Sequence, residues 1–120
     1  MAEHNDFGTQ GEEMAREYLT ANGYSILETN WHYRTHEVDI IAKKGDTIAF
    51  VEVKTRSSKF LGEPEIFVSR TQQRAYVTVA DAYVQKYNRS EEVRFDIIAI
   101  VLNSTTREVR HITNAFSAIV

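Results

Sequence analysis

Apolar residues near the start of the chain recur with the spacing of a helix. Residues 9–22 therefore predict a helix, and Gly23 follows in a position where helices commonly stop. The helix start can lie earlier, at Asn5 or Asp6, because either side chain could cap it. The predicted helix places on one face Met14, Ala15, Tyr18 and Leu19.

Residues 69–88 predict a second helix, and most of the remaining chain reads as strands. The second helix carries an apolar stripe, and Pro64, the only proline, marks residues 57–64 as a loop. The stripe consists of Tyr76, Ala80, Tyr83 and Tyr87, widened by Val79 and Val84. The strands are predicted over residues 24–34, 37–43, 47–56, 93–102 and 108–113.

This order of helix, three strands, helix and two strands predicts an α/β or α+β fold with a central mixed sheet flanked by helices. The second and third strands are joined by the short sequence Lys-Gly-Asp-Thr. A two-residue turn that begins with Gly45 suits the type II′ geometry of tight hairpins.

That turn sets the register of the hairpin. Counting back from the turn places Asp39 opposite Glu52, and Glu37 opposite Lys54, with all four side chains on one face. Opposed side chains have Cβ atoms roughly 4.5–5.5 Å apart, so the two carboxylates would repel each other. A divalent cation would relieve this repulsion, and Lys54 beside it would favour a phosphate.

The alternative is that this face of the hairpin is simply solvated, as in many antiparallel sheets. Two apolar residues on the same face, Ile41 and Phe50, count against that interpretation. The pairing also depends on the turn, because a four-residue loop would place Asp39 opposite Phe50 instead.

Composition restricts the function further. The chain has 120 residues, which fits a single domain over 1–120, and it has no cysteine, which excludes a disulfide scaffold and a thiolate zinc site. The formal net charge is −3, so a nucleic-acid partner would be held by a local basic patch or through a metal. No apolar run approaches the ~20 residues of a membrane span, and the polar N-terminus lacks a signal-peptide pattern, so we expect a cytoplasmic protein.

The spacing Asp39-x12-Glu52-x-Lys54 resembles the PD-(D/E)XK nuclease motif. Longer segments resemble the YraN-like family of uncharacterised bacterial proteins: GTQGEEMAREYLTANGYSILETNW, EVDIIA, FVEVKTR, RFDIIAI and ITNAF. This resemblance covers nearly the whole chain. It implies the restriction-endonuclease-like fold, with an αβββαβ core, and a similarity to archaeal Holliday-junction resolvases.

The resemblance also implies roles for individual residues. Asp39 and Glu52 match the metal ligands of the motif, for Mg²⁺ or Mn²⁺, and Lys54 matches its lysine. Glu12 falls where resolvase-like members carry a catalytic glutamate on the first helix. Its alternative role is a capping box with Thr9.

The chain departs from the family at two positions. His36 stands where many members have glycine, so it could crowd the site or serve only as a surface residue. Gln72 stands where many members have lysine. The spacing Gln72-x3-Tyr76 resembles a motif of RecB-type nucleases, which implies a hydrogen bond from Gln72 to a substrate phosphate or to a metal-bound water. The alternative is that Gln72 belongs to a helix cap with Ser69.

Basic and aromatic residues supply further candidates for binding a substrate. A groove could gather Arg56, Arg70 and Arg74 with Lys54 and Lys59, although most such residues are simply solvated. Trp31 and Tyr33 could stack on bases or lie buried in the core. Glu37 could orient Lys54 or form a weak cross-strand ion pair with it.

Together these features predict a metal-dependent endonuclease that acts on DNA, including branched, repair or recombination intermediates, and the resolvase resemblance implies a homodimer. One rival is a non-catalytic nucleic-acid-binding module of the same fold that works with a partner protein. A second rival is a small structural domain whose polar strand face is only solvated.

Overall fold

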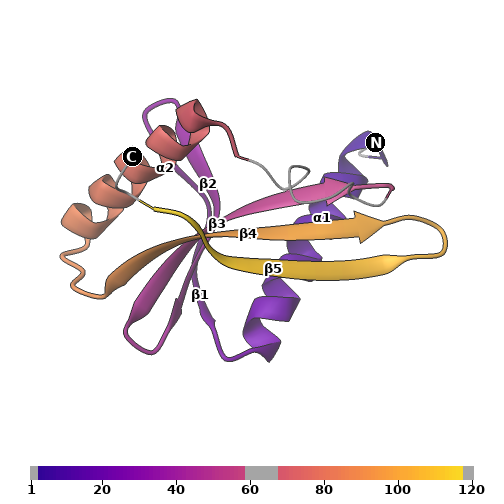
Figure 1. Ribbon diagram of the computed structural model, residues 1–120, viewed down its shortest axis with the longest axis horizontal. Helices are drawn as coiled ribbons and strands as arrows, with labels where there is room; N and C mark the ends of the chain where they lie inside the picture. Colours follow the sequence, from indigo (N-terminus) through magenta and orange to yellow (C-terminus); the bar gives the residue numbers. More distant parts are fainter. Residues whose placement is uncertain (1–2, 59–67, 118–120) are drawn as a thin grey trace.

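A mixed sheet with a helix on each face forms the centre of the protein (Figure 1). The computed structural model describes residues 3–58 and 68–117. The elements follow in the order α1 (Glu3–Ala21), β1 (Ser25–Tyr33), β2 (His36–Lys44), β3 (Thr47–Arg56), α2 (Arg70–Lys86), β4 (Glu92–Leu102) and β5 (Arg107–Phe116).

The strands lie side by side in chain order, β1-β2-β3-β4-β5. Only β3 and β4 are parallel, because α2 carries the chain back across the sheet between them, and the other neighbours are antiparallel. This arrangement confirms the predicted mixed α+β fold and is consistent with a restriction-endonuclease-like core.

The first helix begins earlier than predicted. Because α1 starts at Glu3, Asn5 and Asp6 lie inside it, and the prediction that either caps it is wrong. Thr9 is also interior, so the proposed capping box between Thr9 and Glu12 does not exist.

The end of α1 agrees with the sequence. Gly23 has a φ of 91°, and its N–H donates to the carbonyl of Thr20 at 3.1 Å, while the N–H of Tyr24 donates to that of Leu19 at 3.0 Å. This is a Schellman motif, which requires the left-handed backbone that glycine adopts without strain.

An apolar cluster lies on each face of the sheet. On one face α1 packs Ala15 and Leu19 against a set from β2, β3 and β4 that includes Ile40, Val51 and Ile98. On the other face α2 packs Tyr76, Val79, Ala80 and Tyr83 against Ile41, Ile48, Phe50 and Phe95. The predicted stripe of α2 is therefore confirmed at four positions, whereas Tyr87 at its end is 42% exposed.

The predicted cap of α2 is also confirmed. The side chain of Ser69 accepts a hydrogen bond from the N–H of Gln72 at 3.1 Å. Of the predicted loop over 57–64, residues 59–64 lie outside the described residues, as does Lys59. Neither helix of the described residues combines the length and the hydropathy needed to cross a membrane.

Candidate functional site

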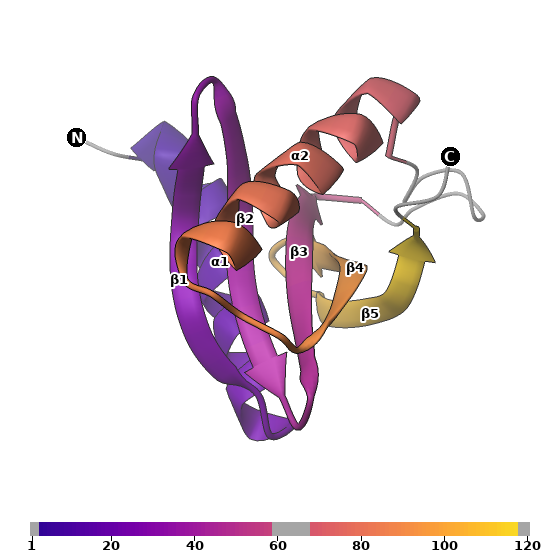
Figure 2. The same ribbon diagram turned by 90° about the vertical axis from the view of Figure 1, so that its left-hand side faces the viewer.

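The sheet divides where β2 and β3 part. The β2–β3 hairpin has the predicted register from the turn up to the pair Ile40–Val51, and Gly45 has the positive φ, 60°, that its turn requires. Beyond that pair the β2–β3 ladder ends. The rest of β2 continues with β1, and the rest of β3 continues with β4, so the two halves of the sheet spread apart (Figure 2). We call this point the fork.

The fork changes one detail of the predicted geometry. Asp39 and Glu52 stand just beyond the last pair, so they are not a ladder pair as predicted. Instead, the N–H of Val53 donates a hydrogen bond of 2.8 Å to Oδ2 of Asp39. The carboxylate thus takes the place of a backbone carbonyl that the diverging β2 no longer offers to β3.

The surroundings of Asp39 disfavour its charged form. Burial raises the pKa of Asp39 to about 7, and the negative charges of Glu52, Glu12 and Glu37 act in the same direction. The hydrogen bond from the N–H of Val53 opposes this shift only in part. When such a carboxyl group is ionised near neutral pH, a nearby positive charge stabilises it.

Glu52 is held by a tyrosine of α2. The hydroxyl of Tyr76 donates to Oε1 of Glu52 at 2.5 Å and lies 3.5 Å from the carbonyl of Val51. Burial and then the charges of Glu52 and Asp39 raise the pKa of Tyr76 well above its usual value. Tyr76 is therefore a neutral donor that fixes one oxygen of Glu52, a role that the sequence did not predict.

α1 approaches β3 very closely at the fork. A Cβ on Gly11 would lie 2.0 Å from Oγ1 of Thr55, so only glycine permits this contact. The next residue, Glu12, is half-buried and close enough to raise the pKa of Asp39. The structure thus brings Glu12 near Asp39 from the opposite face to Tyr76.

The donor set at the fork suits a hard cation. Oδ2 of Asp39 and Oε1 of Glu52 each accept a hydrogen bond. Within the described residues, the second oxygen of each carboxylate accepts none. Mg²⁺ is commonly held by one or two carboxylates and several waters, so two anchored carboxylates with free oxygens fit it. The described residues contain no group of three or more metal-ligating side chains, so Glu12 does not complete such a group.

The predicted substrate-binding residues lie on two elements, β3 and α2. Lys54 follows Glu52 by two residues on β3 and is half-buried. Arg56, at the end of β3, is exposed and donates to the carbonyl of Thr55 at 2.9 Å. Arg70 and Arg74 are exposed on the first turns of α2, where the Gln72 backbone serves the helix cap.

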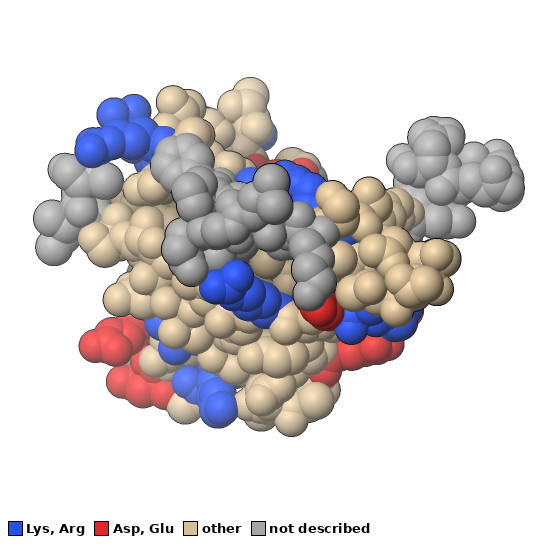
Figure 3. All heavy atoms as spheres, turned by 45° about the vertical axis from the view of Figure 1, so that its right-hand side comes forward, with Lys and Arg blue, Asp and Glu red and all other residues tan. Residues whose placement is uncertain are grey.

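On the face seen in Figure 3, Lys and Arg side chains form separate groups, some of which lie beside Asp and Glu side chains. A single continuous basic groove is therefore not visible on that face of the described residues. The predicted contribution of Lys59 lies outside them.

Other candidates are placed at or beyond the fork. Trp31 is half-buried against the ring of Tyr83, with centroids 5.1 Å apart, which agrees with the core alternative. The carboxylate of Glu37 lies 3.6 Å from Nε2 of His32, so the predicted pairing of Glu37 with Lys54 is wrong. His36 is half-buried and pairs with Tyr33 in the β1–β2 hairpin.

A second charged cluster was missed by the sequence interpretation. Asp96 on β4 is fully buried, and its carboxylate accepts two hydrogen bonds from Arg94, at 2.9 and 2.8 Å, and one from the N–H of Asn114 at 3.0 Å. Nε2 of His111 lies 2.8 Å from the same carboxylate. An aspartate inside the apolar run of β4 was the available signal, because a buried charge needs partners.

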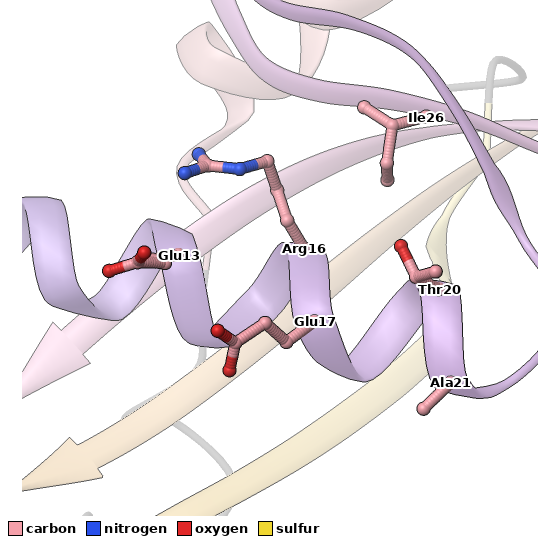
Figure 4. A pocket seen from close by; sticks show the side chains of 6 residues that line it. All are labelled: Glu13, Arg16, Glu17, Thr20, Ala21 and Ile26. Atoms are coloured by element: carbon pink, nitrogen blue, oxygen red, sulfur yellow. The ribbon is translucent and has the colours of Figure 1, made fainter.

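An open groove lies elsewhere, on the outer side of α1 (Figure 4). It is lined by Glu13, Arg16, Glu17, Thr20 and Ala21 of α1 and by Ile26 of β1. None of the predicted site residues lines it, so we place the candidate site at the fork.

The comparisons with known proteins give one consistent match. Residues 11–100 match the profile described as the uncharacterised protein family UPF0102. A UPF0102 protein of Christiangramia forsetii is 48% identical over 116 residues, which cover 97% of this chain and 98% of the relative. One of Parabacteroides distasonis is 48% identical over 118 residues and 98% of both chains, and one of Chlorobium phaeobacteroides is 42% identical over 118 residues, 92% of this chain and 93% of the relative. These names state no activity.

Proposed function

Because the chain belongs to the uncharacterised family UPF0102, whose name gives no reaction, we propose its function from the fork: a metal-dependent endonuclease that hydrolyses phosphodiester bonds in DNA. Branched molecules and repair or recombination intermediates are the DNA substrates that we test first. The choice of DNA over RNA rests on the analogy with resolvases of the same fold.

One observation carries the proposal. Asp39 and Glu52 come from strands that separate at this point, yet each has one oxygen fixed by a neighbour, at 2.8 and 2.5 Å. Burial, and then the charge of Glu52, raises the pKa of Asp39 to about 7. A carboxyl group whose ionisation is disfavoured in this way is expected at a functional site, where a bound cation stabilises the ionised form.

The residues have distinct roles in this proposal. Asp39 and Glu52 would hold Mg²⁺ or Mn²⁺, which when bound supplies Lewis-acid polarisation of the phosphate and a more acidic water. Tyr76 positions Glu52 and keeps one of its oxygens occupied. Lys54, two residues along β3, stabilises the charge that develops on the phosphate, and Glu12 adds a carboxylate from the side of α1.

A cleavage panel tests the function. Wild-type protein is incubated with single-stranded, duplex and four-way-junction DNA in the presence of Mn²⁺ or Mg²⁺. We expect cleavage that falls by at least roughly a hundredfold in Glu52→Gln, Asp39→Asn and Lys54→Ala, because each removes charge stabilisation from the transition state. Glu92→Gln is the matched control, since Glu92 is exposed and pairs with Thr47 at the opposite end of β3. Cleavage that survives in the three site variants would show that another site or a contaminant is responsible.

Metal binding supplies a second readout. Calorimetric titration with Mn²⁺ is expected to give weaker binding for Tyr76→Phe than for wild type, because Glu52 loses its fixed orientation. Tyr83→Phe is the matched control on the same helix, since the hydroxyl of Tyr83 lies 3.5 Å from Oε2 of Glu28 and is not the donor to Glu52. Equal affinity for wild type, Tyr76→Phe and Glu52→Gln would exclude a metal site here.

One observation favours a second candidate, a non-catalytic nucleic-acid-binding module that works with a partner protein. His36 and Gln72 stand where the resemblance to the YraN-like family implies glycine and lysine, so the chain departs from the family pattern at two positions near the proposed site. DNA binding without cleavage under every metal condition would support this candidate over the endonuclease.

A further inference from the structure

The β1–β2 hairpin projects past the fork. Beyond Asp39 the two strands continue through the pairs Trp31–Val38, His32–Glu37 and Tyr33–His36. Three residue pairs extend the hairpin by on the order of 10 Å. In Figure 2 its turn stands at the top on one side of β3, and the start of α2 stands at the same height on the other side.

The β1–β2 turn is the tip of this hairpin, and its first residue has an unusual backbone conformation. Arg34 begins a two-residue turn with a φ of 58°, almost the same as the 60° of Gly45 in the β2–β3 turn. Turns of this kind favour glycine at that position, because a side chain in the left-handed region is strained. The chain therefore uses glycine at one of two equivalent turns and an exposed arginine at the other.

The guanidinium of Arg34 is oriented by its neighbour. Its central carbon lies 5.2 Å from the centroid of the Tyr33 ring, which is a cation–π contact, and Arg34 is exposed to solvent. No ion pair joins Arg34 to an acid within residues 3–58 and 68–117. An arginine that is strained, stacked and without an acidic partner there is suited to an external anion.

The remaining charges support a polyanion rather than a single ion. The tip also carries His32 and His36, and its one acid, Glu37, lies 3.6 Å from Nε2 of His32. Across the fork stand Lys54 and Arg56 on β3. Cationic groups thus occur on both sides of the carboxylate pair, with Arg70 and Arg74 on the first turns of α2.

We propose that the β1–β2 turn is a second binding site for the phosphate backbone of the DNA strand held at the fork, with Arg34 as its main contact. At 3.4 Å of rise per phosphate, the tip reaches roughly three nucleotides from the phosphate at Asp39 and Glu52. The planar guanidinium can donate two hydrogen bonds to one phosphate, and Tyr33 holds it in that orientation. This inference rests on the proposed function and specifies how the substrate strand is held.

Arg34→Gly separates binding from structure. Glycine removes the guanidinium and also removes the backbone strain, so the variant should be at least as heat-stable as its parent. Binding to fluorescent single-stranded and duplex DNA is measured in a Glu52→Gln background, which prevents cleavage. We expect binding weaker by on the order of tenfold, the effect of one charged hydrogen bond, and a salt dependence reduced by about one phosphate contact.

Two further variants complete the experiment. Arg34→Lys keeps the charge but loses the planar fork, so it should bind with intermediate affinity. Arg107→Ala is the matched control, because Arg107 is exposed at the β4–β5 turn, on the right of Figure 1 and away from the β1–β2 turn.

The inference is overturned if Arg34→Gly binds DNA like its parent, if Arg107→Ala weakens binding equally, or if the parent binds no DNA. Failure of the proposed function gives a different result. In that case the wild type does not cleave, yet Arg34→Gly still binds DNA more weakly than its parent.

Discussion

Asp39 and Asp96 begin the same four-residue sequence, Asp-Ile-Ile-Ala, in the two strands that flank β3. Each stands where an antiparallel ladder is interrupted, and each accepts a backbone N–H from the strand across the interruption, from Val53 and Asn114 respectively. The surroundings of the two carboxylates are opposite in charge.

Asp96 is enclosed by the guanidinium of Arg94 and by further hydrogen-bonding groups of His111 and Asn114. Burial opposes its ionisation, but the hydrogen bonds of His111, Arg94 and the Asn114 N–H outweigh burial and hold the pKa of Asp96 below its usual value. Arg94 in turn donates to the hydroxyl of Tyr24 at 2.6 Å. Every charge in this cluster is matched, so its role is structural.

Asp39 lies among acids, and burial together with the charge of Glu52 moves its pKa the other way, to about 7. The same four-residue sequence thus has an aspartate that is paired with positive charge in β4 and one that lacks positive charge in β2. The difference shows that neighbouring side chains, and not the strand itself, decide which aspartate is available to a cation.

The largest effect is expected when the matched cluster is broken. Asp96→Asn removes the fully buried carboxylate that pairs with the half-buried guanidinium of Arg94, so we expect a loss of about 3–5 kcal/mol in the free energy of unfolding. Urea denaturation at pH 7 measures this. Asp81→Asn is the control, since Asp81 is exposed on α2 and bonds only weakly to Gln85, at 3.3 and 3.4 Å. A loss below ~1 kcal/mol for Asp96→Asn would contradict the structural role.

A smaller effect of the opposite sign is expected at Asp39. The pKa of Asp39 is about 7 in the folded protein and 3.8 as a free group, so its contribution to stability is complete below pH 4 and is lost as the pH rises through about 7. The side chain of Asn does not ionise, so Asp39→Asn avoids this loss of stability with pH. Its amide oxygen can still accept the N–H of Val53. Its stability relative to wild type should therefore rise between pH 5 and pH 8, by at most about 3 kcal/mol.

Urea denaturation across this pH range checks the prediction, and Asp81→Asn again serves as the control. The comparison also predicts a contrast with Asp96, whose stabilising contribution is present above pH 4 and is lost only at lower pH. A difference between Asp39→Asn and wild type that does not change with pH would show that Asp39 is ionised without penalty.

The smallest effect concerns the helix that touches both regions. Gly11→Ala places a methyl group 2.0 Å from Oγ1 of Thr55, so α1 must move away from β3, at a cost of about 1–3 kcal/mol. The movement takes Glu12 away from Asp39, so the midpoint of the Asp39 pH effect should fall.

Gly8→Ala is the matched control, because nothing lies within 4 Å of its new methyl group. That variant should gain about 0.5–1 kcal/mol from better helix propensity, and thermal unfolding of both variants at several pH values decides the point. Equal stability for Gly11→Ala and Gly8→Ala would show that α1 is not fixed by the Thr55 contact.

The sequence predicted features that depend on local patterns. Gly23 and Gly45 gave the end of α1 and the turn before β3, and the register of that turn correctly brought Asp39 near Glu52. These features follow from glycine geometry and strand alternation, which act over a few residues.

Features that depend on distant contacts could not be predicted in the same way. The end of the β2–β3 ladder reflects the separate partners of each strand, β1 and β4. The start of α1 at Glu3 extends beyond the apolar face that predicted the helix. The bond from Tyr76 to Glu52 and the cluster around Asp96 join residues from different elements, so no local spacing identifies them.

One hydrogen bond at the fork links the charge of the site to the exchange of a single amide hydrogen with solvent. The N–H of Val53 has the side chain of Asp39, and not a β2 carbonyl, as its acceptor. Its protection therefore depends on how strongly that carboxyl accepts, which changes as Asp39 gains or loses a proton or engages a cation. Amides in the intact part of the ladder, such as that of Val51, have no such dependence, so one backbone position reports the state of the site from inside the sheet.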